Sequence, residues 1–160
     1  MGDSRRFSLF AKLISQNFPL HKYSTIADIA GGKGYLQLSL SSFGYKVTTF
    51  DIRNKFVKGL NYRHKLFNKE LKDDFSLLVG LHPDEATDVI ITEAARRKIP
   101  FVICPCCEKP TDTTFWGGKW VDHLTKYAEK LGFQVTRTQL PMVGKNVVLI
   151  GMFSSNKKNT

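Results

Sequence analysis

Two acidic residues flank a glycine-rich turn in the first third of the chain. Asp28 lies in the short apolar run 25–30, and Asp51 follows a second apolar run at 46–50. Glycine permits a tight turn with positive φ and lets the backbone approach a ligand closely. A carboxylate at the tip of the neighbouring strand can accept hydrogen bonds from two ribose hydroxyls. The spacing predicts a nucleoside-binding site whose turn contains Gly31, Gly32 and Gly34.

A strand, a turn, a helix and a second strand must position this site. Residues 25–30 are apolar and partly β-branched, as in a strand buried on both faces. Residues 35–43 place apolar side chains at helical spacing, and Gly44 can end that helix. Residues 46–50 then form the second strand. One βαβ unit therefore brings the turn and the carboxylate of Asp51 together.

The rest of the chain continues this alternation and ends with two strands joined directly. Alternating strands and helices predict a parallel sheet, and two strands without a helix between them pair antiparallel. We therefore expect an α/β, Rossmann-like sandwich whose sheet is mostly parallel, with one antiparallel strand near the C-terminus. No helix is evident between the second and third strands. The further elements expected are a helix at 4–18 capped by Ser4, a short strand at Leu66–Phe67, a strand at 76–82, a helix from Pro83 to Lys98, a strand at 101–104, a helix at 120–131, and strands at 133–140 and 146–153.

The turn D-I-A-G-G-K-G at 28–34 resembles the first motif of class I S-adenosylmethionine-dependent methyltransferases, usually D-x-G-x-G-x-G, with Ala30 replacing the first glycine. The resemblance implies S-adenosyl-L-methionine as the cofactor and the class I methyltransferase sandwich as the fold. In many such enzymes the tip of the third strand cradles adenine. Phe67 would then stack on the base and Asn68 would hydrogen-bond to it, although Phe67 also suits the core. The residues expected to contact the cofactor are Asp28, Ala30, Gly31, Gly32, Gly34, Asp51, Ile52, Phe67 and Asn68.

A second pair of motifs is more specific. The sequence G-L-H-P-D-E-A-T-D at 80–88, followed by V-I-C-P-C-C at 102–107, is similar to a methyltransferase-domain group carrying L-H-x-C-x-x-A-T-D and then V-P-C-C. That group includes tRNA ribose 2′-O-methyltransferases. The chain departs from it at Asp84, where the group has cysteine, and at Glu108–Lys109, where the group has a His-rich ending. The roles of those residues in relatives are therefore not transferred.

His82 and Asp84 are the candidate catalytic residues. Methyl transfer requires a protein to align the nucleophile with the methyl group and to remove a proton where the nucleophile carries one. The pKa of histidine suits proton abstraction near neutral pH, so His82 is expected to act as a general base or a substrate orienter. Asp84 would bind a substrate amine or a ribose hydroxyl. The structural alternatives are a backbone hydrogen bond for His82 and a favourable helix start for Asp84.

The chain is strongly basic, which favours a polyanionic partner. It has 24 lysines and arginines against 14 aspartates and glutamates, a net charge of +10. RNA is the simplest such partner, and the second motif pair points the same way, although solubility alone also explains a basic chain. An aromatic side chain in a loop can stack on an unpaired base, with ordinary packing as the alternative. The residues expected to contact the substrate are Lys33, Arg53, Cys106 and Trp116.

Cys104, Cys106 and Cys107 lie within four residues of one another, too close to bridge comfortably. A Pro-Cys nucleophile occurs in cytosine-C5 methyltransferases, but there it follows the fourth strand and not the fifth. A zinc site would need His82 or His123 to complete its ligands. We therefore expect no metal and interpret the cysteines as small side chains that pack around the cofactor pocket.

The length of 160 residues fits one domain at 1–153, with an N-terminal helix and connector at 1–24 and a disordered basic tail at 154–160. No apolar run reaches the roughly 20 residues of a membrane helix, and the N-terminus lacks the apolar segment of a signal peptide. The three cysteines, which do not bridge comfortably, fit a reducing cytoplasm, so a cytoplasmic location is expected. The leading hypothesis is a methyltransferase acting on tRNA or rRNA, aided by a partner subunit or a homodimer. The alternatives are a noncatalytic RNA-binding or partner-activating protein with this fold, and a small-molecule methyltransferase.

Overall fold

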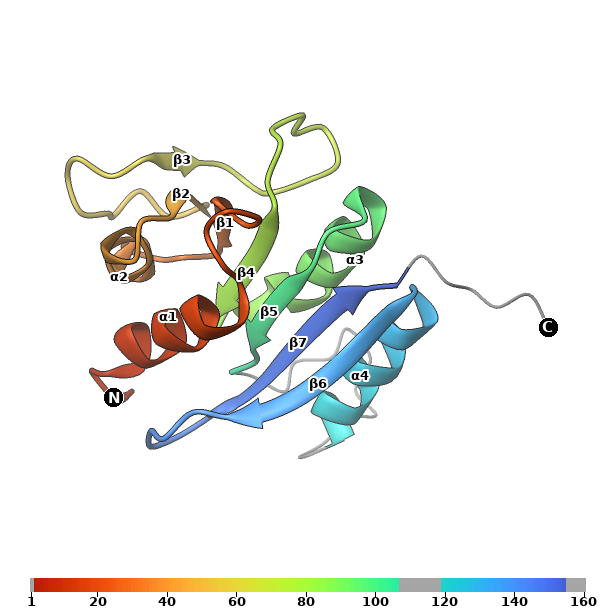
Figure 1. Ribbon diagram of the computed structural model, residues 1–160. Coiled ribbons are helices and arrows are strands. Elements are labelled where there is room, and N and C mark those ends of the chain that lie inside the picture. Colours follow the sequence, from red (N-terminus) through yellow and green to blue (C-terminus); the bar gives the residue numbers. More distant parts are fainter. Residues whose placement is uncertain (1, 107–118, 155–160) are drawn as a thin grey trace.

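The computed structural model describes residues 2–106 and 119–154. Within them one seven-stranded sheet has the order β3-β2-β1-β4-β5-β7-β6 (Figure 1). The elements along the chain are α1 (Arg6–Asn17), β1 (Thr25–Ile29), α2 (Tyr35–Ser42), β2 (Lys46–Asp51), β3 (Tyr62–His64), β4 (Leu77–Leu81), a short 3₁₀ turn (Asp84–Ala86), α3 (Thr87–Arg97), β5 (Phe101–Cys104), α4 (Lys119–Lys130), β6 (Phe133–Gln139) and β7 (Val147–Phe153).

The direction of the strands agrees with the sequence prediction. Strands β1 to β5 pair in parallel, whereas β7 is antiparallel to both β5 and β6. The single antiparallel strand near the C-terminus is therefore confirmed. The order of the strands reverses between β1 and β4, where the chain leaves one half of the sheet for the other. Ligands of open α/β sheets bind at the carboxyl ends of the strands beside such a reversal.

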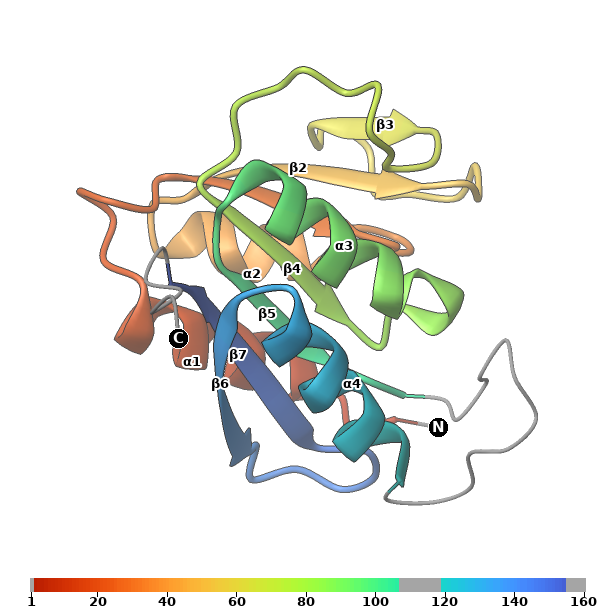
Figure 2. The ribbon, with the colours of Figure 1, turned by 90° about the vertical axis from the view of Figure 1, so that its right-hand side faces the viewer.

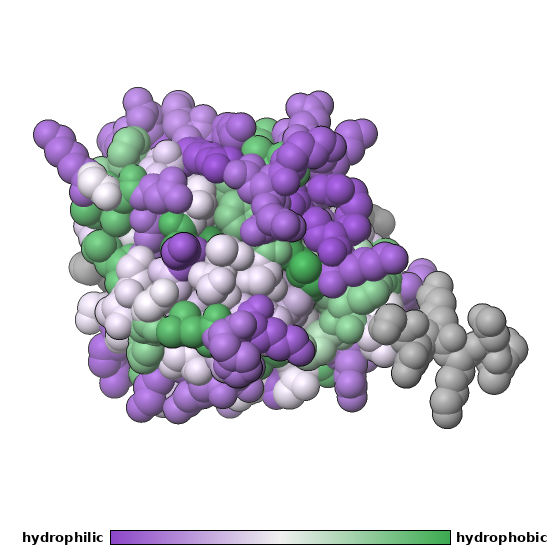
Figure 3. All heavy atoms as spheres, turned by 45° about the horizontal axis from the view of Figure 1, so that its top comes forward, coloured by the Kyte–Doolittle hydropathy of each residue, from purple (hydrophilic) through white to green (hydrophobic). Residues whose placement is uncertain are grey.

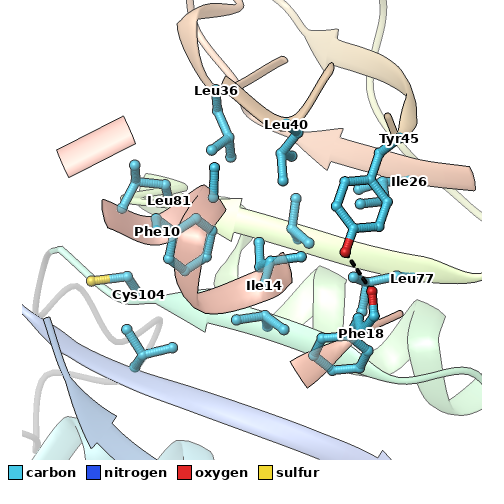
Figure 4. Close-up of a cluster of buried hydrophobic side chains, with 14 of the residues drawn as sticks. Phe10, Ile14, Phe18, Ile26, Leu36, Leu40, Tyr45, Leu77, Leu81 and Cys104 are labelled. Carbon is cyan, nitrogen blue, oxygen red and sulfur yellow. Dashed lines mark hydrogen bonds between the residues drawn. The ribbon is translucent and has the colours of Figure 1, made fainter. Parts of the chain in front are cut away.

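Helices cover both faces of the sheet. Figure 2 shows α3 and α4 in front of it, with α1 and α2 behind. The core on the α1 and α2 side includes Phe10 and Ile14, both fully buried, and Figure 4 shows them against side chains of β4 and β5. The Tyr45 hydroxyl donates to the Phe18 carbonyl and so fixes the end of α1 to the residue that precedes β2. Each fully buried Phe or Ile contributes about 1.5–3 kcal/mol relative to an exposed one, so α1 is held firmly.

Residues 52–61 and 65–76, all of them described, contain no helix. Aromatic side chains of residues 65–76 cover the sheet where no helix does. Phe67 packs edge-on against Phe50 of β2, with ring centroids 5.0 Å apart. Arg97 of α3 donates to the carbonyls of Leu71 and Asp73 at 2.7 Å each and pins this segment to the body of the domain. The expectation of no helix between the second and third strands is confirmed.

Two local predictions were wrong. The third strand is Tyr62–His64 and not Leu66–Phe67, because Phe67 is drawn into the aromatic core while Tyr62 pairs with Thr49 of β2. Ser4 does not cap α1, whose N-cap residue is Arg5 without a side-chain cap. The expected tail at 154–160 lies outside the described residues beyond position 154.

Candidate functional site

A cavity of about 560 Å³ opens at the carboxyl ends of β1, β2 and β4, next to the reversal of strand order. Its size falls within the range of small-molecule pockets, about 300–1,000 Å³. Its walls come from the ends of β1 and β2, the segment after β3, and the 3₁₀ turn that follows β4. The residues that line it include Ala30, Asp51, Ile52, Arg53, Lys65, Leu66, Phe67 and Asp84.

The glycine-rich turn wraps over the carboxyl group of Asp28. A Cβ atom at Gly31 would lie 2.2 Å from Asp28 Oδ2, so this position excludes every side chain. Gly32 and Gly34 have φ values of +60° and +85°, which glycine adopts without strain. Ala30, at the position of the family's first glycine, also has a positive φ of +55°. The backbone at Ala30 is therefore left-handed, like that of Gly32 and Gly34, although Ala30 carries a side chain.

Residues with strained backbone conformations cluster after the carboxyl ends of β1 and β4. Among the described residues, four that are not glycine have a positive φ: Ala30, His82, Asp84 and Lys98. Lys98 is the C-cap of α3, where a left-handed residue is common. The other three follow β1 and β4, on the two sides of the reversal in strand order. Such residues cost about 1–3 kcal/mol each and cluster at ligand sites.

Asp28 is completely buried. Its Oδ2 accepts a hydrogen bond from the Thr49 hydroxyl at 3.1 Å, while Oδ1 has no partner among the described residues. Burial raises the pKa of Asp28 to about 7, the hydrogen bond from Thr49 opposes this shift, and the nearby charge of Asp51 adds to it. The carboxyl group is therefore protonated through the mildly acidic range.

Asp51 ends β2 and joins it to the turn. Its Oδ2 accepts the Gly32 N–H at 2.8 Å, and its Oδ1 accepts the Arg53 N–H at 2.8 Å. Burial opposes ionisation of Asp51, but the hydrogen bonds from the Arg53 side chain, the Arg53 backbone and Gly32 outweigh it and hold the pKa below its usual range. The site thus presents an ionised carboxylate at the floor of the cavity.

Sequence reasoning missed Tyr62. Its hydroxyl lies 2.8 Å from the Gly32 carbonyl and 3.0 Å from the Arg53 carbonyl, so it ties the turn to the residues that follow β2. Nothing in the sequence marked this edge strand, because β3 has only three residues and its side chains are partly exposed. The contacts of Tyr62 with the residues after β1 and β2 become visible only once the strands are paired.

At the tip of β4 the two catalytic candidates have different surroundings. The His82 Nε2 atom lies 2.9 Å from the Lys145 carbonyl, and the His82 backbone N–H donates to Cys104. His82 does not line the cavity, whereas Asp84 does. The Cys106 thiol donates to Asp84 Oδ1 at 3.2 Å. Cys106, predicted to contact the substrate, therefore does not line the cavity itself but contacts a residue that does.

Of the other residues predicted from the sequence to contact cofactor or substrate, some line the cavity and others do not. Ile52 and Phe67 line the cavity, but Asn68 does not, and its side-chain oxygen instead accepts the Glu70 N–H in a local turn. Lys33 is exposed on the turn. Arg53 lines the cavity and forms an ion pair with Asp51. Trp116 and Cys107 lie outside the described residues.

The described residues include no group of three or more His, Cys, Asp or Glu side chains that could hold a metal ion. Cys104 is fully buried in the core beneath α1, and burial raises the pKa of its thiol to about 12. A thiol with that pKa is not a nucleophile near neutral pH.

Among the helices that the structure describes, none is long and apolar enough to cross a membrane.

Comparison with solved structures identifies the architecture. A SAM-dependent methyltransferase from Aquifex aeolicus superposes with a TM-score of 0.61 at 18% identity, covering 95% of this chain and 94% of its own. Magnesium protoporphyrin IX methyltransferase from Synechocystis, solved with bound SAM, gives 0.64 at 13% identity, covering 94% and 79%. Ribosomal protein L11 methylase from Lactobacillus delbrueckii gives 0.64 at 14% identity, covering 90% and 77%.

The fold is that of the class I methyltransferases. At these identities the likeness concerns the fold alone, and the printed substrates of the solved structures differ widely. The sequence matches no protein-family model, and a comparison with curated proteins finds no match. The prediction of fold class is confirmed.

The buried Asp28 makes stability depend on pH. Folding raises its pKa to about 7, and the unfolded chain ionises it near pH 4. Between these values the folded protein binds the extra proton, so the free energy of unfolding falls as the pH rises from about 4 to about 7. Asp28→Asn removes this contribution, which amounts to at most about 1.4 kcal/mol per pH unit. Urea unfolding over this range should therefore show a flatter profile for the variant than for the parent.

Asp74→Asn serves as the control, because Asp74 is an exposed carboxylate on the segment before β4. It should keep the pH profile of the parent. Parallel profiles for Asp28→Asn and the parent would show that Asp28 is ionised throughout this range in the folded protein.

Proposed function

We propose that this protein is an S-adenosyl-L-methionine-dependent methyltransferase. The observation that carries the proposal is the ionised carboxylate of Asp51, hydrogen-bonded to the glycine-rich turn at the floor of a nucleoside-sized cavity, in a class I methyltransferase fold. A carboxylate in this place suits two ribose hydroxyls. When bound, the cofactor supplies an electrophilic methyl group on a sulfonium sulfur.

The walls of the cavity suit a flat apolar base. Ile52 and Leu66 line it, and their exposed fractions of 63% and 66% are high for large apolar side chains. An adenine ring between them would remove this surface from water, at roughly 25 cal/mol for each Å² of apolar area. Phe67 also lines the cavity. The residues of this chain therefore fit a nucleoside cofactor.

Asp84 is the residue best placed to handle the substrate. Asp84 lines the cavity just beyond the tip of β4, next to the reversal in strand order, where a methyl acceptor would approach. There it would accept a hydrogen bond from a substrate hydroxyl or amine and orient the lone pair of the nucleophile. If His82 donates from Nε2 to the Lys145 carbonyl, its Nδ1 remains an acceptor for a proton at the same strand end. We assign substrate orientation to Asp84, which lines the cavity, and proton removal to His82, which directly precedes the cavity-lining Pro83.

RNA is the substrate class that the surface supports best. Figure 3 shows hydrophilic residues gathered over the upper part of the view, the region of β3, with apolar residues exposed between them. Phe56, 41% exposed, stacks on Tyr62 at 4.2 Å between ring centroids. Basic and aromatic side chains together form the surface that single-stranded nucleic acids bind. The exposed lysines and arginines between β2 and β4 are Arg53, Lys55, Lys58, Lys65, Lys69 and Lys72.

One observation favours a second candidate, a partner-binding protein that keeps the fold without its chemistry. The Arg53 side chain already contacts both carboxylate oxygens of Asp51. A protein that had lost its cofactor would benefit from neutralising this acid permanently. Binding of the cofactor separates the two candidates.

Asp51→Asn tests the cofactor site. The amide removes the charge and half of the acceptor capacity, so we expect the affinity for S-adenosylhomocysteine to fall by about tenfold or more. Isothermal titration calorimetry of the parent, the variant and Asp74→Asn gives the three dissociation constants, and Asp74→Asn should bind as the parent does. Equal affinity of Asp51→Asn and the parent would remove the proposed site, and no binding to any of them would favour the partner-binding candidate.

The RNA surface is tested by its salt dependence. In a variant with Lys55, Lys58 and Lys69 all changed to Ala, each lost phosphate contact should lower the slope of log affinity against log salt by about 0.7. Fluorescence anisotropy with a labelled single-stranded RNA measures this slope. The matched control changes Lys12, Lys126 and Lys130, exposed lysines of α1 and α4. Equal slopes in the two triple variants would contradict the proposed surface.

A further inference from the structure

All the acceptor positions of Asp51 are taken. An ionised carboxylate has about four lone-pair positions on its two oxygens. Oδ1 accepts the Arg53 backbone N–H at 2.8 Å and Arg53 Nε at 3.1 Å. Oδ2 accepts the Gly32 N–H at 2.8 Å and Arg53 Nη2 at 3.2 Å. Two ribose hydroxyls cannot bind this carboxylate until two of the present donors leave.

The two backbone donors are fixed. The Tyr62 hydroxyl lies within hydrogen-bond distance of the carbonyls of both Gly32 and Arg53, and so ties the two peptide segments that supply these donors to each other. The Arg53 guanidinium is the mobile pair of donors, because the Arg53 side chain is 61% exposed whereas that of Asp51 is 2% exposed. Arg53 Nη2 lies only 3.7 Å from the position of a Cβ at Gly32, so the guanidinium lies over the turn. It therefore stands where a ribose would lie.

We propose that Arg53 exchanges between Asp51 and an anionic group of the substrate, and that cofactor binding drives the exchange. This inference rests on the cofactor site proposed above. The ribose hydroxyls take the two positions on Asp51 that the guanidinium leaves, and Arg53 then turns to the cavity rim, which it shares with Lys65. A phosphodiester of an RNA strand is the group that a released guanidinium beside a lysine would bind.

The exchange couples the two ligands. The cofactor binds only to the fraction of the protein in which Arg53 has left Asp51. Its apparent affinity is therefore lower than its intrinsic affinity by that fraction. A polyanion that draws Arg53 away increases this fraction and so increases the affinity for the cofactor, and the cofactor increases the affinity for the polyanion by the same factor. The substrate-loaded cavity would therefore fill with cofactor more readily than the free one.

Arg53→Ala tests the competition directly. The variant leaves both backbone donors on Asp51 and removes the two that compete with ribose, so we expect it to bind S-adenosylhomocysteine about five- to tenfold more tightly than the parent. This ligand carries no net charge at neutral pH, which removes the general effect of losing one positive charge. Arg53→Gln keeps most of the side-chain length without the charge and should also bind more tightly than the parent.

Arg137→Ala is the matched control. Arg137 forms an exposed ion pair with Asp122 at 2.7 Å, between β6 and α4 and outside the cavity, and its loss should leave the affinity unchanged. Titration calorimetry of the four proteins distinguishes the outcomes. Equal or weaker binding by both Arg53 variants overturns the inference while the cofactor site stands. No binding by the parent or by any variant overturns the proposed function itself.

The anionic half of the inference is tested by repeating the titrations with a saturating short oligouridylate. The parent and Arg137→Ala should then bind S-adenosylhomocysteine several-fold more tightly than without RNA, and Arg53→Ala should show no such gain. An oligouridylate that leaves the affinity of the parent unchanged, or that raises the affinity of Arg53→Ala equally, overturns the coupling.

Discussion

The hydrogen bond from the Gly32 N–H to the Asp51 carboxylate is the contact on which the site depends. It joins the turn after β1 to the tip of β2, and so converts two neighbouring strand ends into one rigid floor. The turn can make this bond because Gly31 leaves room for the buried Asp28 beneath it. A side chain at position 31 would strike the side chains of Asp28 and Thr49.

The parts of the fold that depend on burial were predictable from the sequence. Strands such as β1 and β4 consist of apolar runs because both of their faces are covered, and the helices carry apolar side chains at helical spacing for the same reason. The third strand was missed because Tyr62–His64 is short and polar at the edge of the sheet, where burial leaves little signal. Phe67 was then assigned to a strand although its ring fills the place that a helix would otherwise cover.

The candidate site could be predicted only in part. A glycine turn and an acid at a strand tip are visible in sequence, since their spacing reflects one βαβ unit. The hydrogen bonding of the Asp51 carboxylate is not visible in the sequence, because it depends on which side chain donates to its oxygens. Arg53, two residues further along the chain, is that donor. The bond between His82 and the Lys145 carbonyl joins residues far apart in sequence and follows from the pairing of β5 with β7.

The proposed function depends above all on a nucleoside cofactor binding at Asp51. The most direct test is a two-dimensional ¹H–¹⁵N NMR spectrum of the protein recorded with and without S-adenosylhomocysteine. Because the amides of Gly32 and Arg53 both donate to Asp51, their resonances should shift on binding, together with that of Ile52, while those of β6 remain in place. An unchanged spectrum at a large excess of ligand, or shifts confined to residues away from the cavity, would contradict the account.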